Sequence, residues 1–208
     1  WQTTLAVMNT GEADSTVTFS AYDAEGNLTD IFEQVLKAKQ NFVGEVSDIF
    51  PDSEIASMTI ISQDDQPLYG LSLYGTTDGL RLASAPIRPA YASSLHLPHI
   101  ACTDQWWTGI GLINAGEAST DISFSLLDEN GERLNVTTKP FNPKQRLAIG
   151  IRELFNGNID PSARTMKIES SEGQPIRGIY LISTTDGLRL MGDELYEFDL
   201  HGLGVRRD

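Results

Sequence analysis

One stretch of seven residues occurs twice in this chain, letter for letter. The sequence TTDGLRL spans Thr76–Leu82 and returns at Thr184–Leu190. Upstream, the stretch that begins Asn9-Thr10-Gly11-Glu12 returns as Asn114-Ala115-Gly116-Glu117. The offset between the copies is 105 residues at the front and 108 at the back, so three residues have been inserted in the second copy. A period of this length corresponds to one small domain and is too long for a solenoid unit.

The repeat predicts two domains joined by a short linker. Each copy has about a hundred residues, which is enough for one modest hydrophobic core. Between the copies, the segment 86–94 reads PIRPAYASS, with two prolines and small polar residues that are typical of a linker. We therefore expect a first β-sandwich repeat over 1–88, a linker over 89–94 and a second repeat over 95–208.

Apolar and polar residues alternate along much of both copies, which predicts strands with one buried face. Val17, Phe19 and Ala21 are separated by hydroxyl residues, and the second copy keeps the alternation at Ile122 and Phe124. A helix would show a period of 3.6 residues instead. About seven or eight short strands per copy indicate an all-β fold of two tandem antiparallel, Ig-like β-sandwich modules.

Equivalent positions in the two copies give a list of expected core residues. They are Leu5, Val7, Val17, Phe19, Ile60, Leu71 and Leu82 in the first copy, and Ile110, Leu112, Ile122, Phe124, Ile168, Ile179 and Leu190 in the second. We also expect Leu73 and Leu181 to share the inward face of their strands.

The sequence also predicts tight turns and short helices. Asp78-Gly79 and Asp186-Gly187 lie between extended runs, which predicts two-residue type I′ hairpins because Gly adopts positive φ cheaply. One helical turn per copy is expected just before Phe50 and Phe155, with these two rings closing one end of each core.

Composition restricts the class of partner and the chemistry. The formal net charge of −14 argues against nucleic acid or an anionic membrane surface as partner, since both would repel the chain. No run of about 20 apolar residues is present, so we expect no membrane insertion. The single cysteine, Cys102, excludes an intrachain disulfide. Because the chain begins at Trp1, inside a repeat motif, we expect a mature or trimmed chain that lacks its targeting signal.

Metal and catalytic sites find little support in the sequence. His96, His99 and Cys102 are the only cluster of soft ligands, but alternation along a strand points His99 away from the other two, and the first copy offers no fourth ligand. The turn aspartates at positions 23, 78, 128 and 186 lack the EF-hand spacing. Their turn chemistry explains them without calcium. No G-x-S-x-G, P-loop or dinucleotide motif occurs. We expect no cofactor, no metal and no catalytic residue.

Exposed aromatic and cationic residues are the candidates for binding. The tryptophans Trp1, Trp106 and Trp107, with the tyrosines Tyr69, Tyr74 and Tyr91, could form an aromatic platform for sugar rings. The repeat favours a core-capping role for Trp1 and Trp106. In contrast, Trp107 corresponds to Gln2, so the fold does not require it. Arg81 and Arg189 follow the repeated turns, where each either pairs with a nearby carboxylate or recognises an anion. The candidate ligand-binding residues are Trp107, Tyr74 and Arg189.

The segment WWTGIGLINAG, residues 106–116, resembles a repeated module of secreted or cell-surface bacterial proteins with the pattern WWTGIALVNPG. The likeness continues through Glu153-Leu154-Phe155, then residues 174–178, then residues 185–188. The first copy departs from the pattern, with Gln2 for the second tryptophan and Thr4 for the glycine. The resemblance implies a tandem β-sandwich module that is secreted, periplasmic or on the cell surface, and it supplies no catalytic residues.

Three function classes follow from these observations. The first is a non-catalytic module of a secreted or surface-exposed protein, for adhesion, assembly or spacing, with a protein or glycan partner. The second is carbohydrate or small-ligand binding through exposed aromatics. The third is a hydrolase that acts on polysaccharide, because paired carboxylates are set in three dimensions and cannot be read from spacing.

The two ends of the chain give a last hypothesis. Residues 95–101 are expected to form a first strand of the second copy, and the first copy has no counterpart, so its sheet should have an unpaired edge. Leu200-His201 repeats Leu95-His96 at an offset of 105. We expect the C-terminal segment either to return and complete the first repeat, or to belong to a third module or lie loose.

Overall fold

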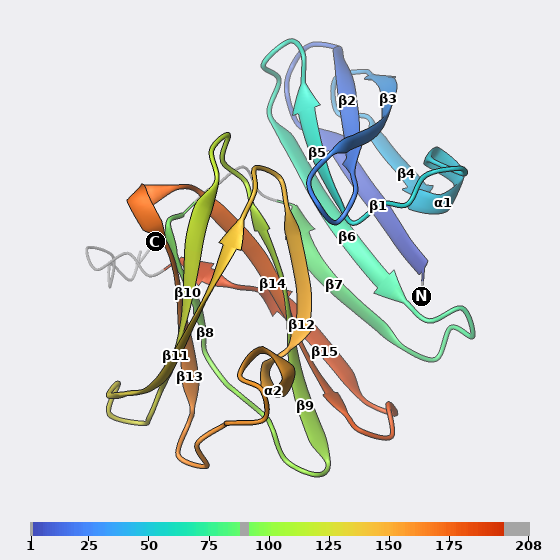
Figure 1. Ribbon diagram of the computed structural model, residues 1–208. Helices are drawn as coiled ribbons and strands as arrows, with labels where there is room; N and C mark the ends of the chain where they lie inside the picture. Colours follow the sequence, from blue (N-terminus) through green and yellow to red (C-terminus); the bar gives the residue numbers. More distant parts are fainter. Residues whose placement is uncertain (1, 88–91, 198–208) are drawn as a thin grey trace, which may run out of the picture.

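The computed structural model describes residues 2–87 and 92–197 of the 208-residue chain. The protein is all-β, as the alternation predicts, and every strand pair in the described part is antiparallel (Figure 1). In chain order the strands are β1 (Gln2–Asn9), β2 (Ser15–Tyr22), β3 (Leu28–Leu36), β4 (Asn41–Glu45), β5 (Ser57–Ser62), β6 (Leu68–Gly75), β7 (Leu82–Ile87), β8 (Ser94–Leu97), β9 (Trp106–Asn114), β10 (Thr120–Leu127), β11 (Arg133–Phe141), β12 (Arg146–Gly150), β13 (Thr165–Ser170), β14 (Ile176–Thr184), β15 (Leu190–Glu194) and β16 (Tyr196–Glu197).

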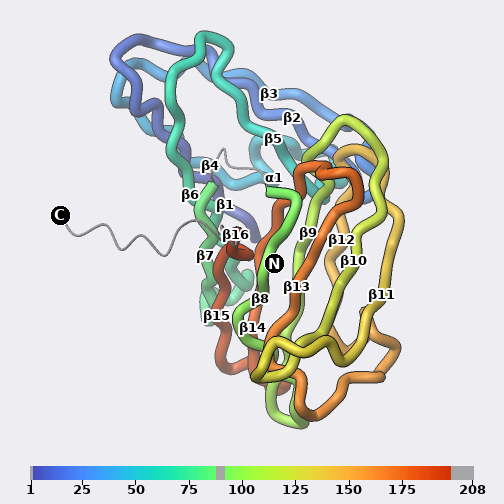
Figure 2. Tube along the Cα trace, turned by 90° about the vertical axis from the view of Figure 1, so that its left-hand side faces the viewer, coloured from blue at the N-terminus to red at the C-terminus, as the bar shows by residue number. Residues whose placement is uncertain are grey.

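The strands form four sheets, two in each half of the chain. In the first half, residues 2–87, a sheet of order β4-β1-β6-β7 faces a sheet of order β3-β2-β5. In the second half, residues 92–197, a sheet of order β12-β9-β14-β15 faces a sheet of order β11-β10-β13-β8-β16. Figure 2 shows the first half above the second, and strands β7 and β15 are in contact.

Each half has its own cluster of buried apolar side chains. The cluster of the first half consists of Leu5, Val7, Val17, Phe19, Ala21, Leu36 and Phe50. The cluster of the second half is larger, and its fully buried members include Leu97, Ile122, Phe124, Leu126, Ile151, Met166 and Ile168. Since a strand buries alternate residues, these clusters follow directly from the period-two patterns of the sequence.

The expected core is confirmed on β1, β2, β9, β10 and β13, and the predicted facing is wrong on β6 and β14. Leu71 and Ile179, expected in the core, are only partly buried, and the inward residues of their strands are Ser72 and Tyr180. Both strands carry apolar residues on both faces, so alternation alone does not fix the facing. The neighbouring strand fixes it, because inward Ile110 lies opposite Tyr180 in the register.

Three further expected core positions are more exposed than predicted. Leu82 is 64 % exposed, because the inward residues of β7 are Ala83 and Ala85. Leu190 and Ile60 are partly exposed. Ile60 differs in burial from its counterpart in the second half, because Ile168 is fully buried.

The Asp-Gly turns are hairpins of a different type from the one expected. At the first repeated turn, Gly79 donates to the Thr76 carbonyl and Thr76 to the Arg81 carbonyl. Gly79 has φ +71°, whereas Asp78 is not among the residues with positive φ. A type I′ turn needs positive φ at both central residues, so the expectation of type I′ is wrong.

Two short helices close the cores as the sequence indicates. They are α1 (Val46–Ile49) and α2 (Ile151–Leu154), each a single turn. Phe50 and Phe155 follow them and are buried at 2 % and 4 % exposure. In the first half, Phe50 packs edge-on against Phe32 at a ring distance of 6.4 Å.

The repeated Asn-x-Gly motif has the same buried role in both halves. The Asn9 side chain donates to the carbonyls of Ala13 and Leu36, and its oxygen accepts from Gly11 N. Asn114 makes the matching bonds to Ala118, Asn142 and Gly116. Both asparagines are fully buried. Since buried polar groups must be bonded, this network explains why both copies keep the residue.

Part of the expected linker belongs to the second half. Ile176 N donates to the Ala92 carbonyl at 2.7 Å, and Ser170 N to the Ser93 carbonyl at 2.9 Å. The structure does not describe Trp1, residues 88–91, which include Tyr91, or the C-terminal segment from Phe198 onward. The hypothesis about C-terminal closure therefore remains a prediction.

No helix in the described part is long and apolar enough to cross a membrane.

Candidate functional site

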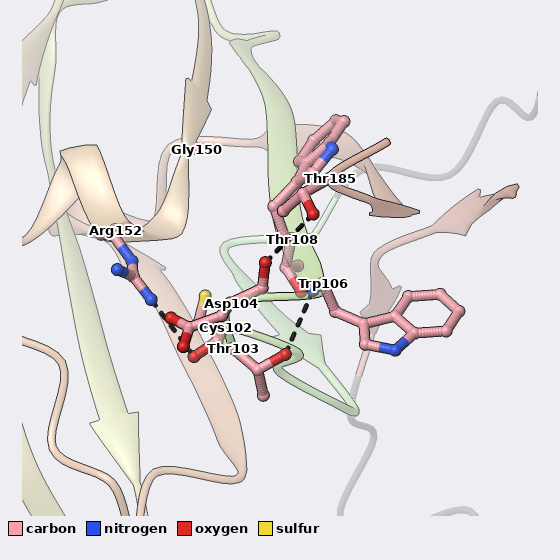
Figure 3. Close-up of a pocket in the computed structure, with 9 residues that line it drawn as sticks. Cys102, Thr103, Asp104, Trp106, Thr108, Gly150, Arg152 and Thr185 are labelled. Atoms are coloured by element: carbon pink, nitrogen blue, oxygen red, sulfur yellow. Dashed lines mark hydrogen bonds between the residues drawn. The ribbon is translucent and has the colours of Figure 1, made fainter. Parts of the chain in front are cut away.

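A shallow hollow opens at one end of the second half, where β9 begins. Its volume is about 390 Å³. It lies between the loop that precedes β9, the start of α2 and the turn after β14 (Figure 3). The lining residues are Cys102, Thr103, Asp104, Trp106, Trp107, Thr108, Gly150, Arg152 and Thr185.

Hydrogen bonds hold the loop that forms one wall of the hollow. The Thr103 hydroxyl accepts from Gln105 N at 3.2 Å and from Trp106 N at 3.1 Å. From the other side, Thr185 donates its hydroxyl to the Asp104 carbonyl at 3.0 Å and its amide to the Gln105 carbonyl at 2.8 Å. The second TTDGLRL motif therefore forms the turn after β14 and also holds this loop through the two hydrogen bonds of Thr185.

The thiol of Cys102 is not activated as a nucleophile by the groups around it. Burial is the main cause that raises the pKa of the Cys102 thiol above its ordinary value. Arg152 lies near it but donates to the Cys102 backbone carbonyl at 3.5 Å, as Figure 3 shows. The thiolate is the reactive form, so a raised pKa leaves Cys102 a weak nucleophile at neutral pH.

Trp107 is the aromatic residue that the hollow exposes, as the sequence comparison suggested. Its side chain is 38 % exposed on the outer face of its sheet. A Cβ atom on Gly109 would lie 2.7 Å from Cζ3 of Trp107, so the indole lies against a glycine that makes room for it. Trp106 is instead packed partly buried against the core, in line with its expected capping role.

The first half has a different surface at the corresponding place. A smaller hollow of about 210 Å³ is lined there by Gln2, Thr4, Leu73 and the turn after β6. Gln2 stands where the second half has Trp107, and Thr4 where it has Gly109. Among the described residues, an exposed indole at this place is therefore found in the second half.

Tyr74 and Arg189, the other two candidate ligand-binding residues, do not line the hollow. Tyr74 lies on β6 of the first half, with its hydroxyl 3.1 Å from that of Ser72. Arg189 is exposed beside the repeated turn. The pKa of Asp186 is lowered mainly by hydrogen bonds from Thr184 and Leu188, and further by the charges of Arg189 and Arg81.

Several lining residues were not singled out as candidates from the sequence, and Asp104, Arg152 and Thr185 are among them. Arg152 follows the start of a helix whose counterpart in the first half has Ser47 at that position. Arg152 could therefore have been found in the same way as Trp107, from a difference between the two copies. Asp104 and Thr185 come together only through the fold.

Metal ligation gains no support from the geometry. His99 is exposed, whereas His96 and Cys102 are partly buried. Among residues 2–87 and 92–197, no three His, Cys, Asp or Glu residues are grouped to hold a metal ion. The carboxylate of Asp128 accepts from the amides of Asn130 and Glu132, and these bonds lower its pKa. The carboxylate of Asp23 likewise accepts from the amides of Glu25 and Asn27.

Comparisons with known proteins leave the family open. No family model matches the chain, and no curated protein matches it. The crystal structure of Thermotoga maritima 1070 is similar at 16 % identity and a TM-score of 0.43, over 52 % of this chain and 96 % of that one. A protein of Parabacteroides distasonis that is inferred to be secreted is similar at 10 % identity and a TM-score of 0.26, over 96 % of this chain and 75 % of that one. Likenesses at these scores support no inference about function.

Proposed function

We propose that this chain is a non-catalytic structural module of an exported bacterial protein, and that its two halves act as one rigid unit for spacing or assembly. The observation that carries the proposal is the packed contact between β7 of the first half and β15 of the second. Export rests on the resemblance of residues 106–116 to modules of secreted and cell-surface proteins.

The contact between β7 and β15 is built from small residues. Ala83 and Ala85 are 6 % and 3 % exposed, although neither belongs to the core cluster of the first half. Opposite them, a Cβ atom on Gly192 would lie 3.4 Å from Cβ of Ala83. Small side chains let two backbones approach closely, so the contact fixes the angle between the halves better than a flexible linker would.

Two turns add to this contact on either side. The Arg81 guanidinium lies against the second repeated turn, 3.0 Å from the position of a Cβ atom on Gly187. On the other side, Arg146 N donates to the Ala24 carbonyl at 3.2 Å. The neighbouring Gly26 has φ +93°, and a Cβ atom there would lie 2.2 Å from the Pro143 carbonyl oxygen. Contacts on three segments support a single rigid body.

Charge substitution at the contact tests the proposal. Ala83→Glu places a buried carboxylate between the halves, which is costly because the charge has no partner there. Ser84→Glu is the matched control, since Ser84 lies on the same strand and is exposed. In scanning calorimetry we expect one transition for the wild type and the control, and two separated transitions for Ala83→Glu. Equal melting of both variants would contradict a rigid unit, and turnover of a polysaccharide by the purified chain would contradict a non-catalytic role.

A second candidate function is glycan binding, which the exposed indole of Trp107 favours. A flat ring beside hydroxyl and charged groups is a common surface for a sugar. Tryptophan fluorescence titration with soluble polysaccharides tests it, with Trp107→Ala as the loss variant and Tyr69→Ala as the control. Tyr69 is 61 % exposed on the first half, so its loss should not affect binding at the hollow.

A further inference from the structure

The outer edge of β5 has no strand beside it in the described part of the chain. The corresponding strand of the second half, β13, pairs with β10 on one edge and with β8 on the other. The inner pairings match, since Ile60 lies opposite Phe19 just as Ile168 lies opposite Phe124. The first half therefore has the acceptor for a strand of the β8 kind, and an unpaired edge invites such pairing.

Side-chain burial shows where that strand is missing. Met166 and Ile168 are fully buried, and two leucines of β8 lie opposite them in the register. Their counterparts Met58 and Ile60 are only partly buried. The apolar surface that β8 covers in the second half is thus partly open in the first, beside the free edge.

A polar atom at the same edge lacks a partner. The Ser57 hydroxyl, at the start of β5, is buried and has no hydrogen-bond partner among the described residues. Buried hydroxyls are nearly always bonded, so an unbonded one on this edge strand marks a place where a further polar group is expected. An added strand supplies both kinds of group.

We propose that the β5 edge binds the C-terminal segment of a second copy of this chain, as an added antiparallel strand. Residues 199–203 read DLHGL, and Leu200-His201 repeats Leu95-His96 at the offset of 105 that relates Asn9 to Asn114. The register of β8 on β13 places Leu200 opposite Ile60 and His201 opposite Thr59. Main-chain bonds supply affinity in such strand addition, and alternate side chains supply specificity.

A second copy fits this arrangement better than closure within one chain. Glu197 pairs with Leu95 at the outer edge of the five-stranded sheet. In Figure 1 the red end of the described chain lies at the left of the second half, whereas β5 lies at the upper right in the first half.

The proposed association between copies is head to tail, so it extends the rigid unit into a chain of copies. It goes beyond the proposed function, because strand addition at β5 does not depend on the contact between β7 and β15.

Disulfide trapping tests the proposed register. In a Cys102→Ser background, we mix a Thr59→Cys variant with a His201→Cys variant and let them oxidise. Residues directly opposite in adjacent strands are close enough for a disulfide. We expect a covalent dimer by intact mass. Val43→Cys, which is on an exposed strand at the far side of the first half, is the control partner and should give none. Equal yields with Val43→Cys would overturn the proposal, as would a crosslinked monomer from the double variant Thr59→Cys/His201→Cys in place of dimers.

Light scattering after size exclusion gives a second measure that needs no cysteine. The wild-type chain should show a mass that rises with concentration, and Leu200→Asp should weaken this association at least tenfold. Val205→Asp, in the same segment but beyond the proposed strand, should leave it unchanged. A constant monomer mass for the wild type over the whole concentration range would overturn the proposal.

Discussion

In the second half, strand β13 lies between β10 and β8, whereas in the first half its counterpart β5 has, among residues 2–87 and 92–197, only β2 beside it. The two halves share a repeated sequence, the same inner register and the same buried asparagine. The second half has two further strands, β8 and β16, and β8 lies beside β13, where Ile168 is fully buried and its counterpart Ile60 is not. The repeated sequence gives both halves the same inner register, whereas full burial of the core at β5 or β13 depends on whether a further strand pairs with the outer edge.

The largest expected effects come from emptying the two cores. Phe124→Ala and Phe19→Ala each remove a fully buried ring, so each should cost about 3–5 kcal/mol of unfolding free energy. Urea unfolding followed by fluorescence measures both. Because the first core is open at β5, it can relax more easily, and we expect the smaller loss for Phe19. A shift of less than a few degrees in melting temperature for either variant would show that its strand faces the other way.

The buried asparagines should behave alike in both halves. Asn9→Ala and Asn114→Ala each leave two carbonyls and one amide without the side-chain partner they had. Leaving buried groups unbonded costs about 1–3 kcal/mol. Chemical denaturation measures this, with Ser84→Ala as an exposed control. If only one of the two variants is destabilised, the network is not equivalent in the two halves.

The matching ion pairs should contribute little. Lys144 lies 2.6 Å from Glu117 and Lys39 lies 2.5 Å from Glu12, with both glutamates almost fully exposed. We expect Glu117→Gln and Glu12→Gln each to cost less than about 1 kcal/mol, and 0.5 M salt to reduce the difference further, as is general for exposed pairs of order 0–1 kcal/mol. Lys144 is more buried than Lys39, so the loss should be larger for Glu117. A larger loss of stability for Glu12→Gln than for Glu117→Gln would contradict this expectation.

The smallest effect is a pH dependence confined to the closing strand of the second half. A hydrogen bond to Asp193 raises the pKa of Tyr196 to about 12. Since the folded pKa is above the unfolded one, the stabilisation is complete below about pH 10 and is lost as pH rises toward 12. Burial also raises the pKa of Tyr180, so absorbance titration should show late phenolate formation in the wild type that is reduced, but not abolished, in Tyr196→Phe. A Tyr196 signal near pH 10 would mean that β16 does not hold the bond.

Much of the fold could be predicted where one strand face is polar and the other apolar. Phe19 and Phe124 lie in such strands, and both are fully buried. The prediction was wrong for Leu71 and Ile179 because their strands carry apolar residues on both faces, and on β6 the inward face even includes Ser72. The register with the neighbouring strand decides the facing. The exposure of Leu82 depends on the neighbouring half, which sequence patterns do not describe.

The candidate site could be predicted only in part, for a similar reason. Trp107 was found because the first copy has Gln2 at that position, and a difference between copies marks a residue the fold does not need. The wall formed by Asp104 and Thr185 joins positions 81 residues apart in sequence. No local pattern reports such a contact, since it exists only once the sheet has formed.

Hydrogen exchange along β5 and β13 tests the central claim most directly. A chain shortened to end at Glu197 removes the proposed added strand, and dilute conditions remove association. We expect the amides of β5 that point away from β2, toward the free edge, to exchange without protection, while the amides of β13, which has strands on both edges, remain protected up to global unfolding. Equal protection of the two strands would contradict the claim that the first half is open at β5.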